Sequence, residues 1–362
     1  MEDNFPTRLT VLMLRLSLLI KLLVFILLAG CEERIDQVSS GSHVLDSIDL
    51  ALITKTVDRF EEVVNDHSRR SVISIEAFHL SVENFLENPS IEHRQQMKDL
   101  WLQAHDVFLA ASFFTFTDQS QNIFQIDAWP IQEGFLDSLP DYPQSGIVND
   151  VTVAITEVSI RAQHGITHVQ EVSLGFHALE YLIFGRAIDD FSISDDELKV
   201  RRRQTLDIVT ELLKQDINSM FAETDGAHSD FRSNLVENNA STVLKLMIQR
   251  LHAKVQILLA EANHIDNENF GHSRFSGSSW SNLSAQVRVL GELTGEQTAI
   301  DRVFTLLDQK TSADYRLTLS QTNDIFATDD ADEEQLARVT LLFTALGHQL
   351  GDFQIVLQNS AH

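Results

Sequence analysis

The sequence predicts an all-α protein. Proline and glycine are scarce, at five and fourteen of 362 residues, and the alternation of apolar and polar residues that is typical of half-buried strands is rare. Apolar residues instead recur at helical spacing, as in the run Ile48, Leu52, Val57, Phe60 and Val64. We therefore expect long amphipathic helices that are joined by short loops, an arrangement that favours up-and-down neighbours.

The limits of the helices follow from capping sequences and breaks. Residues 194–197 form a capping sequence before the helical pattern at 198–220, and residues 294–297 form another before the pattern at 300–307. Three prolines make 118–145 the longest irregular stretch. Further helices are expected at 71–87, 90–117, 146–171, 174–185, 234–266, 279–293, 311–326 and 333–358.

Residues 1–30 have the layout of a signal peptide. Three basic residues precede an apolar run at 22–28, which is shorter than the roughly 20 residues that a membrane-spanning helix needs. Small residues then lead to Cys31. Counted from Met13, the layout is that of a compact signal peptide, so we interpret residues 1–12 as an upstream extension.

Cys31 is the only cysteine of the chain. Leu-Ala-Gly-Cys at this position resembles the lipobox of bacterial lipoproteins, in which the cysteine becomes the acylated first residue; the alternative is an ordinary secretory signal with a chance cysteine. The resemblance implies a lipid-anchored linker at 31–42 and a place in the bacterial cell envelope, on the periplasmic face. Glu32 favours the outer membrane. We expect the protein to contact the membrane through this anchor only.

The formal net charge of −26 limits the classes of partner. So acidic a chain repels nucleic acid, because it has no basic footprint that could release counterions from phosphates. An acidic surface concentrates cations, although it also simply keeps a protein soluble. We therefore expect no nucleic-acid partner.

The mature chain divides into halves of similar size. A polar segment near residue 190 separates an expected N-terminal bundle at 43–190 from a C-terminal bundle at 191–362. Residues 78–113 and 317–353 share a faint pattern of helix, polar break and helix. The pattern predicts two related up-and-down bundles that arose by duplication, although chance similarity between helical segments would produce the same picture.

Metal-ligand side chains are most concentrated between His164 and Glu180. His177 and Glu180 are three residues apart, so on a helix they project to one side and can hold one cation or share a proton. Their neighbours are apolar, so the pair is expected to be buried, where it could equally serve as a structural clamp between helices. His168 and Glu171 have polar neighbours and are interpreted as a solvated face.

Several familiar enzyme signatures are missing. The sequence has no HExxH zinc motif, no GxSxG motif and no glycine-rich phosphate loop. Ferritin-like di-iron proteins carry ExxH twice, whereas here the order is HxxE.

Four segments in order resemble the imelysin family. Residues 175–185 resemble its GxHxxE signature, 127–137 its Asn-Ala-Trp-Pro-Leu-Asp-Glu-Gly segment, 273–276 its Arg-Phe-Ser segment, and 101–116 its tryptophan-led helix. The resemblance implies an exported protein of two related helical bundles, with its functional site where the bundles meet. Members occur beside iron-uptake systems or under iron control, and some have been classed as metallopeptidases.

The resemblance also implies site residues. It places the signature pair at His177 and Glu180 as metal ligands, with Glu133 as a third ligand that would bind through oxygen. The residues implied to line the site are Trp129, Asp137, Gly175 and Ser276. The chain departs from the family in the tryptophan-led helix, where His105, Ser112 and Thr115 stand in place of an Arg, a Glu and a second Arg.

These observations favour a cell-envelope protein of iron acquisition that binds iron, or an iron-bearing ligand, at His177 and Glu180. Iron is the expected metal ion, zinc is the alternative, and components of iron transport are the expected partners. A second hypothesis is an imelysin-type metallopeptidase, which needs three protein ligands, a water and a general base. A third is a non-catalytic interaction module in which the His177/Glu180 pair is a buried clamp.

Overall fold

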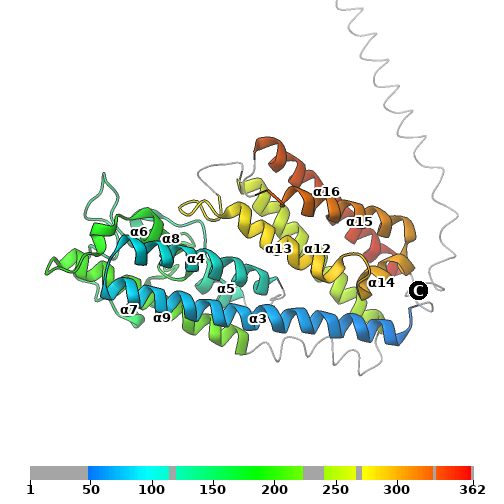
Figure 1. The fold of residues 1–362 in the computed structure, drawn as a ribbon, viewed down its shortest axis with the longest axis horizontal. Coiled ribbons are helices and arrows are strands. Elements are labelled where there is room, and N and C mark those ends of the chain that lie inside the picture. The colour runs from blue at the N-terminus through cyan, green and yellow to red at the C-terminus, as the bar shows by residue number, and fades with distance from the viewer. Residues whose placement is uncertain (1–47, 114–119, 223–239, 266–270, 329–331, 360–362) are drawn as a thin grey trace, which may run out of the picture.

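A computed structural model describes residues 48–113, 120–222, 240–265, 271–328 and 332–359 (Figure 1). These ranges contain twelve α-helices and one short 3-10 helix, without a β-strand. The predicted all-α class is therefore confirmed. The expected signal peptide, Cys31 and the expected linker at 31–42 lie outside the described residues, as does Thr115. None of the described helices is long and apolar enough to cross a membrane.

Helix α3 (Leu50–Glu87) runs the length of the molecule (Figure 1). The Asp49 carboxylate caps it by accepting a hydrogen bond from the Leu52 amide at 2.7 Å. The sequence pattern predicts two helices here, at 48–64 and 71–87, whereas the structure has one helix of 38 residues. The intervening residues are helix-compatible, and no proline or glycine interrupts them before the break at Pro89.

One hydrophobic core fills the N-terminal bundle. The second half of α3 packs there against α4 (Ile91–Ser112) and α9 (Glu197–Ala222), and α8 (Gly175–Gly185) packs against both of these helices. Shorter elements complete this bundle, namely α5 (Ser120–Asp127), α6 (Glu133–Leu136), α7 (Glu157–Gln163) and the 3-10 helix η1 (Ile188–Phe191).

A second core fills the C-terminal bundle, and the first half of α3 belongs to it. Residues 52–64 of α3 contribute apolar side chains to this core. The other helices of this bundle are α12 (Ala240–Ile265), α13 (Ser279–Thr294), α14 (Ala299–Leu307), α15 (Gln309–Ile325) and α16 (Glu333–Asn359).

The cores do not divide at residue 190, where the sequence analysis places the boundary. Helix α9 follows that point in the chain but packs with the N-terminal bundle, and the start of α3 precedes it but packs with the C-terminal one. Both exchanges bury apolar helix faces that would otherwise meet water. The origin of the two bundles by duplication stays a prediction.

The expected helix at 146–171 is wrong, since only α7 forms within it. The Arg201 side chain donates hydrogen bonds to the carbonyl groups of Ile147, Val148, Asp150 and Val153, and so holds that backbone in a non-helical path. The stretch 118–145, expected to be irregular, contains the short helices α5 and α6.

The capping sequence expected at 294–297 also differs from the structure. Thr294 lies inside α13, where its hydroxyl group donates to the Leu290 carbonyl group. Thr298 caps α14 instead, accepting from the Asp301 amide at 3.2 Å. The true cap lies one turn later because α13 continues to Thr294.

Candidate metal centre

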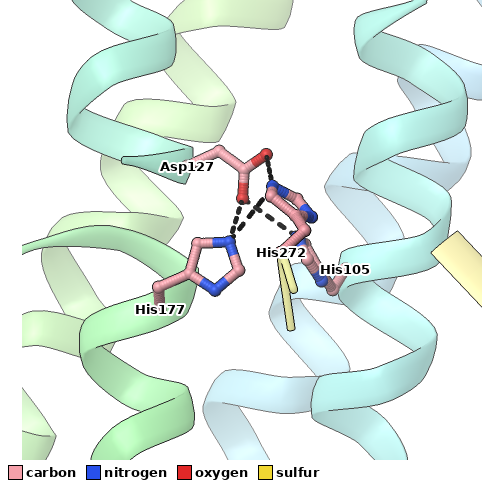
Figure 2. A group of neighbouring side chains, drawn as sticks. All are labelled: His105, Asp127, His177 and His272. Atoms are coloured by element: carbon pink, nitrogen blue, oxygen red, sulfur yellow. Dashed lines mark hydrogen bonds and ion pairs between the residues drawn. The ribbon is translucent and has the colours of Figure 1, made fainter. Parts of the chain in front are cut away.

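Three imidazoles and one carboxylate converge where the two bundles meet (Figure 2). His105 comes from the middle of α4, Asp127 from the last residue of α5 and His177 from the first turn of α8. His272 comes from the loop that leads into α13, a helix of the C-terminal bundle. One nitrogen or oxygen atom of each residue lies within 4.8 Å of those of the other three.

Asp127 lies at the centre of this cluster. Its Oδ1 atom is 2.9 Å from His105 Nε2 and 3.2 Å from His177 Nε2. Its Oδ2 atom is 3.5 Å from His272 Nε2, and the Nε2 atoms of His177 and His272 are 3.3 Å apart. All three imidazoles therefore present the same nitrogen, Nε2, to one point (Figure 2).

Burial sets the charges of the cluster. Burial lowers the pKa of His105 despite the attraction of Asp127, so His105 favours its neutral form. Burial opposes the charged form of His177 as well, but hydrogen bonds and charges from Asp127 and Glu180 outweigh it and raise the pKa of His177 to about 9. Burial would raise the pKa of Asp127, yet the surrounding imidazoles hold it well below its usual range.

Glu180 ties His177 to the loop of the other bundle. Its Oε2 atom is 2.9 Å from His177 Nδ1. Its Oε1 atom accepts hydrogen bonds from the Phe275 amide at 3.1 Å, the Ser276 amide at 2.8 Å and the Ser276 hydroxyl group at 2.7 Å. Burial would raise the pKa of Glu180, but His177 and these donors lower it, so the carboxylate is charged. A charged acceptor at Nδ1 keeps a proton there and leaves Nε2 to face the cluster.

Gly175 sets the separation between α8 and Asp127. Its φ angle is +82°, a left-handed conformation that favours glycine. A Cβ atom at this position would lie 2.3 Å from the carbonyl oxygen of Ile126, the residue before Asp127. The glycine of the GxHxxE sequence therefore allows the backbone that carries Asp127 to approach the start of α8.

Aromatic rings enclose the cluster. The ring of His105 packs against both Trp101 and Phe176, with centroid distances of 4.9 Å and 4.7 Å. The rings of Trp129 and His272 are nearly perpendicular, with 5.2 Å between their centroids. Apolar walls lower the local dielectric constant and strengthen the electrostatic interactions among the four polar groups.

The structure places the predicted site residues in two groups. His177, Glu180, Gly175, Trp129 and Ser276 lie at or beside the cluster, as described above. Glu133 does not belong to the four-residue cluster; its carboxylate pairs with the Arg274 guanidinium group, and both side chains are about one-third exposed. Its role as a ligand stays a prediction.

Asp137 lies within a separate buried network. Its carboxylate pairs with Arg202 at 2.7 Å and Arg186 at 3.3 Å, and it accepts a hydrogen bond from Asn149 at 3.0 Å. The site-lining role that the resemblance implies for Asp137 also stays a prediction.

The other histidines of the 164–180 segment point elsewhere. The chain turns after α7, so the continuous helix that would set them on one face does not form. His164 Nε2 contacts the Phe124 carbonyl group at 2.9 Å, and His168 is exposed. Glu171 caps the turn at Thr167 and His168.

His105, Asp127 and His272 are the cluster residues that sequence reasoning missed as ligands. They are far apart along the chain, so no spacing rule relates them to each other or to His177. The family resemblance contained the available signals: His105 replaces an arginine, Asp127 replaces an asparagine, and His272 immediately precedes the Arg-Phe-Ser segment.

The cluster fits a transition-metal ion by its donor set and its spacing. Imidazole and carboxylate ligands suit iron and zinc. Bonds of about 2.0–2.2 Å in a tetrahedral arrangement separate neighbouring ligand atoms by about 3.4 Å. The carboxylate oxygens of Asp127 lie 2.9–3.5 Å from the three Nε2 atoms, and the four ligand atoms all lie within 4.8 Å of one another. Glu180, on the outer nitrogen of His177, is the orienting partner that a metal-bound histidine usually has.

Comparisons with known proteins agree with this architecture. The family model described as imelysin matches residues 64–350. A crystal structure of a protein described as an iron-regulated protein A precursor, from Parabacteroides distasonis, is similar with a TM-score of 0.67 and 13% identity, covering 86% of this chain and 96% of that one. An imelysin-like protein from Psychrobacter arcticum has a TM-score of 0.62 and 13% identity, covering 84% and 94%.

No curated protein matches the chain. The likeness to the two crystal structures establishes the fold, and the family model covers most of the sequence. The chain therefore belongs to the imelysin family.

Proposed function

We propose that this protein is a cell-envelope lipoprotein of iron acquisition that binds iron, or an iron-bearing ligand, at His105, Asp127, His177 and His272. Glu180 acts as the positioning residue that orients His177. The observation that carries the proposal is the convergence of three Nε2 atoms on one buried carboxylate. Membership of the imelysin family and the similarity to a protein described as iron-regulated support iron over other ions.

The donor set differs from the pair that the sequence motif predicts. Both carboxylate oxygens of Glu180 already accept hydrogen bonds from His177 and the loop at 275–276. Releasing this carboxylate to a metal would leave buried donors unpaired, which is costly. Of the two residues of the motif, His177 therefore supplies a metal ligand, and Glu180 fixes the orientation of its ring through the hydrogen bond at Nδ1.

The geometry favours binding over peptide hydrolysis. A catalytic zinc site keeps three protein ligands and an open position for water, whereas four protein ligands are typical of a closed zinc site. Here four side chains converge, and the carboxylate nearest to His177 outside the cluster is Glu180, which is already engaged. Glu180 is therefore not free to activate water as a general base.

The charges of the site also suit a cation. His177 carries a proton between two carboxylates, and a metal ion at Nε2 would replace that positive charge. Asp127 and Glu180 would together balance a divalent ion, which is the condition for burying a charge at low cost.

The test is anaerobic titration of Fe(II) into the purified full chain, with Zn(II) and Mn(II) as competitors. We expect one ion per chain in the native protein and in His252→Ala, whose imidazole contacts Gln256 and Gln354 away from the cluster. We expect no binding in a folded His177→Ala variant. Equal binding by His177→Ala would overturn the proposed site.

Two further readouts separate the alternatives. Cleavage of a peptide library that a chelator abolishes would support the metallopeptidase. A large loss of thermal stability in His177→Ala, with no effect of metal on the native protein, would identify the His177/Glu180 pair as a structural clamp.

A further inference from the structure

Asn282 links the two bundles beside the candidate metal centre. This residue lies on α13 with 2% of its surface exposed. Its amide nitrogen donates a hydrogen bond to the Asp106 carboxylate of α4 at 2.7 Å. Its amide oxygen accepts a hydrogen bond from the Ser273 hydroxyl group, also at 2.7 Å. One buried side-chain amide thus joins a helix of the N-terminal bundle to the loop that carries His272.

Each end of this link is next to a cluster residue in the sequence. Asp106 follows His105, and Ser273 follows His272. The imidazoles of His105 and His272 stack, with 5.4 Å between their centroids and 26° between their planes. Both present Nε2 to Asp127 (Figure 2). The link therefore holds together two chain segments whose imidazoles come from different parts of the fold.

Hydrogen-bond chemistry fixes the direction in which the amide of Asn282 points. A carboxylate oxygen only accepts, so Asp106 requires the NH2 group and leaves the carbonyl oxygen for Ser273. Ser273 is fully buried, and its backbone amide donates a hydrogen bond to the Ser279 hydroxyl group at 2.8 Å. The residue after His272 is thus held at its backbone and at its side chain by the first residues of α13.

His272 needs this support more than the other two imidazoles do. His105 and His177 are held by helix backbones, whereas His272 lies on a loop, and loop backbone is more mobile than helix. Glu180 orients the ring of His177 through Nδ1. Within the described part of the chain, the Nδ1 atom of His272 has no such hydrogen-bond partner. The position of the His272 ring therefore depends on how its backbone is held.

We propose that Asn282 is a positioning residue of the metal site, which fixes His272 relative to His105 through its bonds to Ser273 and Asp106. This inference rests on the proposed metal site. With the link in place, the ring of His272 is already aimed at the metal position before an ion arrives. Without it, the metal must order the loop as it binds, and that loss of conformational entropy weakens affinity.

The experiment measures metal affinity and stability of the full chain in matched variants. Fe(II) is titrated anaerobically against a calibrated competing chelator, and urea unfolding of the metal-free chain reports stability. Asn282→Ala removes the link. Gln286→Ala is the control, because Gln286 lies one turn later on α13, is fully buried and donates a hydrogen bond to Glu261 of α12 at 3.0 Å. We expect metal affinity to fall about 10–100-fold in Asn282→Ala and to stay within about threefold in Gln286→Ala.

Two further comparisons separate positioning from a general loss of packing. Asn282→Asp sets two carboxylates against each other and should weaken metal binding. The double variant Asp106→Asn/Asn282→Asp restores a donor opposite an acceptor and still offers an oxygen to Ser273, so its affinity should return to within about threefold of the native value. In a His272→Ala background, Asn282→Ala should change the remaining affinity less than about twofold, because the ring that it positions is absent.

Each other outcome is decisive. Native affinity in a folded Asn282→Ala chain, or an equal loss in Gln286→Ala, overturns the inference and leaves the metal site intact. The same holds if Asn282→Ala weakens binding equally with and without His272. If His272→Ala binds no metal, the exchanged pair decides, and its failure to regain affinity overturns the inference. An absence of metal binding in the native chain overturns both proposals.

Ser273→Ala replaces Asn282→Ala if that variant does not fold. It removes a single hydroxyl group and leaves the hydrogen bond between Asn282 and Asp106 in place. Reduced metal affinity is expected, and native affinity in Ser273→Ala would overturn the inference.

Discussion

Replacing Gly175 with alanine tests how the candidate metal centre is held together. The φ angle of +82° costs an L-residue about 1–2 kcal/mol. The new Cβ atom would lie 2.3 Å from the Ile126 oxygen, where ordinary contact begins at 3.4 Å. The backbone before Asp127 must therefore move by about 1 Å, and overpacking of this kind costs roughly a further 1–3 kcal/mol.

Gly277→Ala is the matched control. Gly277 has a φ angle of +72°, and a Cβ atom there would meet nothing within 4 Å. We expect Gly277→Ala to lower the free energy of unfolding by about 1–2 kcal/mol and Gly175→Ala by about 2–5 kcal/mol. Displacement of Asp127 should also weaken metal binding by about 10–100-fold in Gly175→Ala.

Urea unfolding of the metal-free chains, followed by circular dichroism, measures the two stability losses, and metal titration of each variant measures affinity. Equal losses in the two variants would show that the close approach to Ile126 contributes nothing beyond backbone strain. Unchanged metal affinity in a destabilised Gly175→Ala chain would refute the link between this glycine and the position of Asp127.

Three further perturbations have expected outcomes. The pKa of His177 is raised from 6.5 to about 9. Its proton therefore stabilises the metal-free fold fully below pH 6.5, and this stabilisation is lost as the pH rises through 9. Urea unfolding at several pH values across this range measures the loss. The same proton competes with metal, so competition titrations should show affinity rising about tenfold per pH unit up to about pH 9, and a flat profile would contradict this. Glu180→Gln should lower metal affinity about 10–100-fold in a folded chain, as titration against a chelator would show; native affinity would mean that Glu180 does not position His177. Asp137→Asn leaves Arg202 and Arg186 without their carboxylate partner, so urea unfolding should show that the free energy of unfolding falls by about 3–5 kcal/mol. Metal affinity should stay within about threefold of the native value. A loss of metal binding would place Asp137 in the site.

The sequence predicted the parts of the fold that depend on local pattern. Helical periodicity and the scarcity of glycine and proline predicted the all-α class, and the expected helix at 174–185 matches α8 within one residue. The i, i+3 spacing correctly brought His177 and Glu180 onto one side of that helix. Such features depend on neighbours a few residues away, so a single sequence contains the information.

The remaining features depend on contacts between distant segments. Arg201 on α9 holds residues 147–153 in a non-helical path through hydrogen bonds to their carbonyl groups, and no residue near 150 in the sequence predicts this. Likewise His105, Asp127 and His272 meet only because α4, α5 and the loop before α13 pack at the junction of the bundles. A motif search found the histidine that shares its helix with a carboxylate and missed the partners that tertiary structure supplies.

The shared helix α3 has a consequence for how the chain reaches this structure during synthesis. Residues 52–64 are among the first to emerge from the ribosome, yet their apolar partners extend to Leu357 on the last helix. Contacts of such long sequence separation form late, because the intervening chain must be ordered first. The first of the described helices to be made is therefore among the last to be completed, and a nascent chain truncated anywhere before α16 exposes an unfinished hydrophobic face.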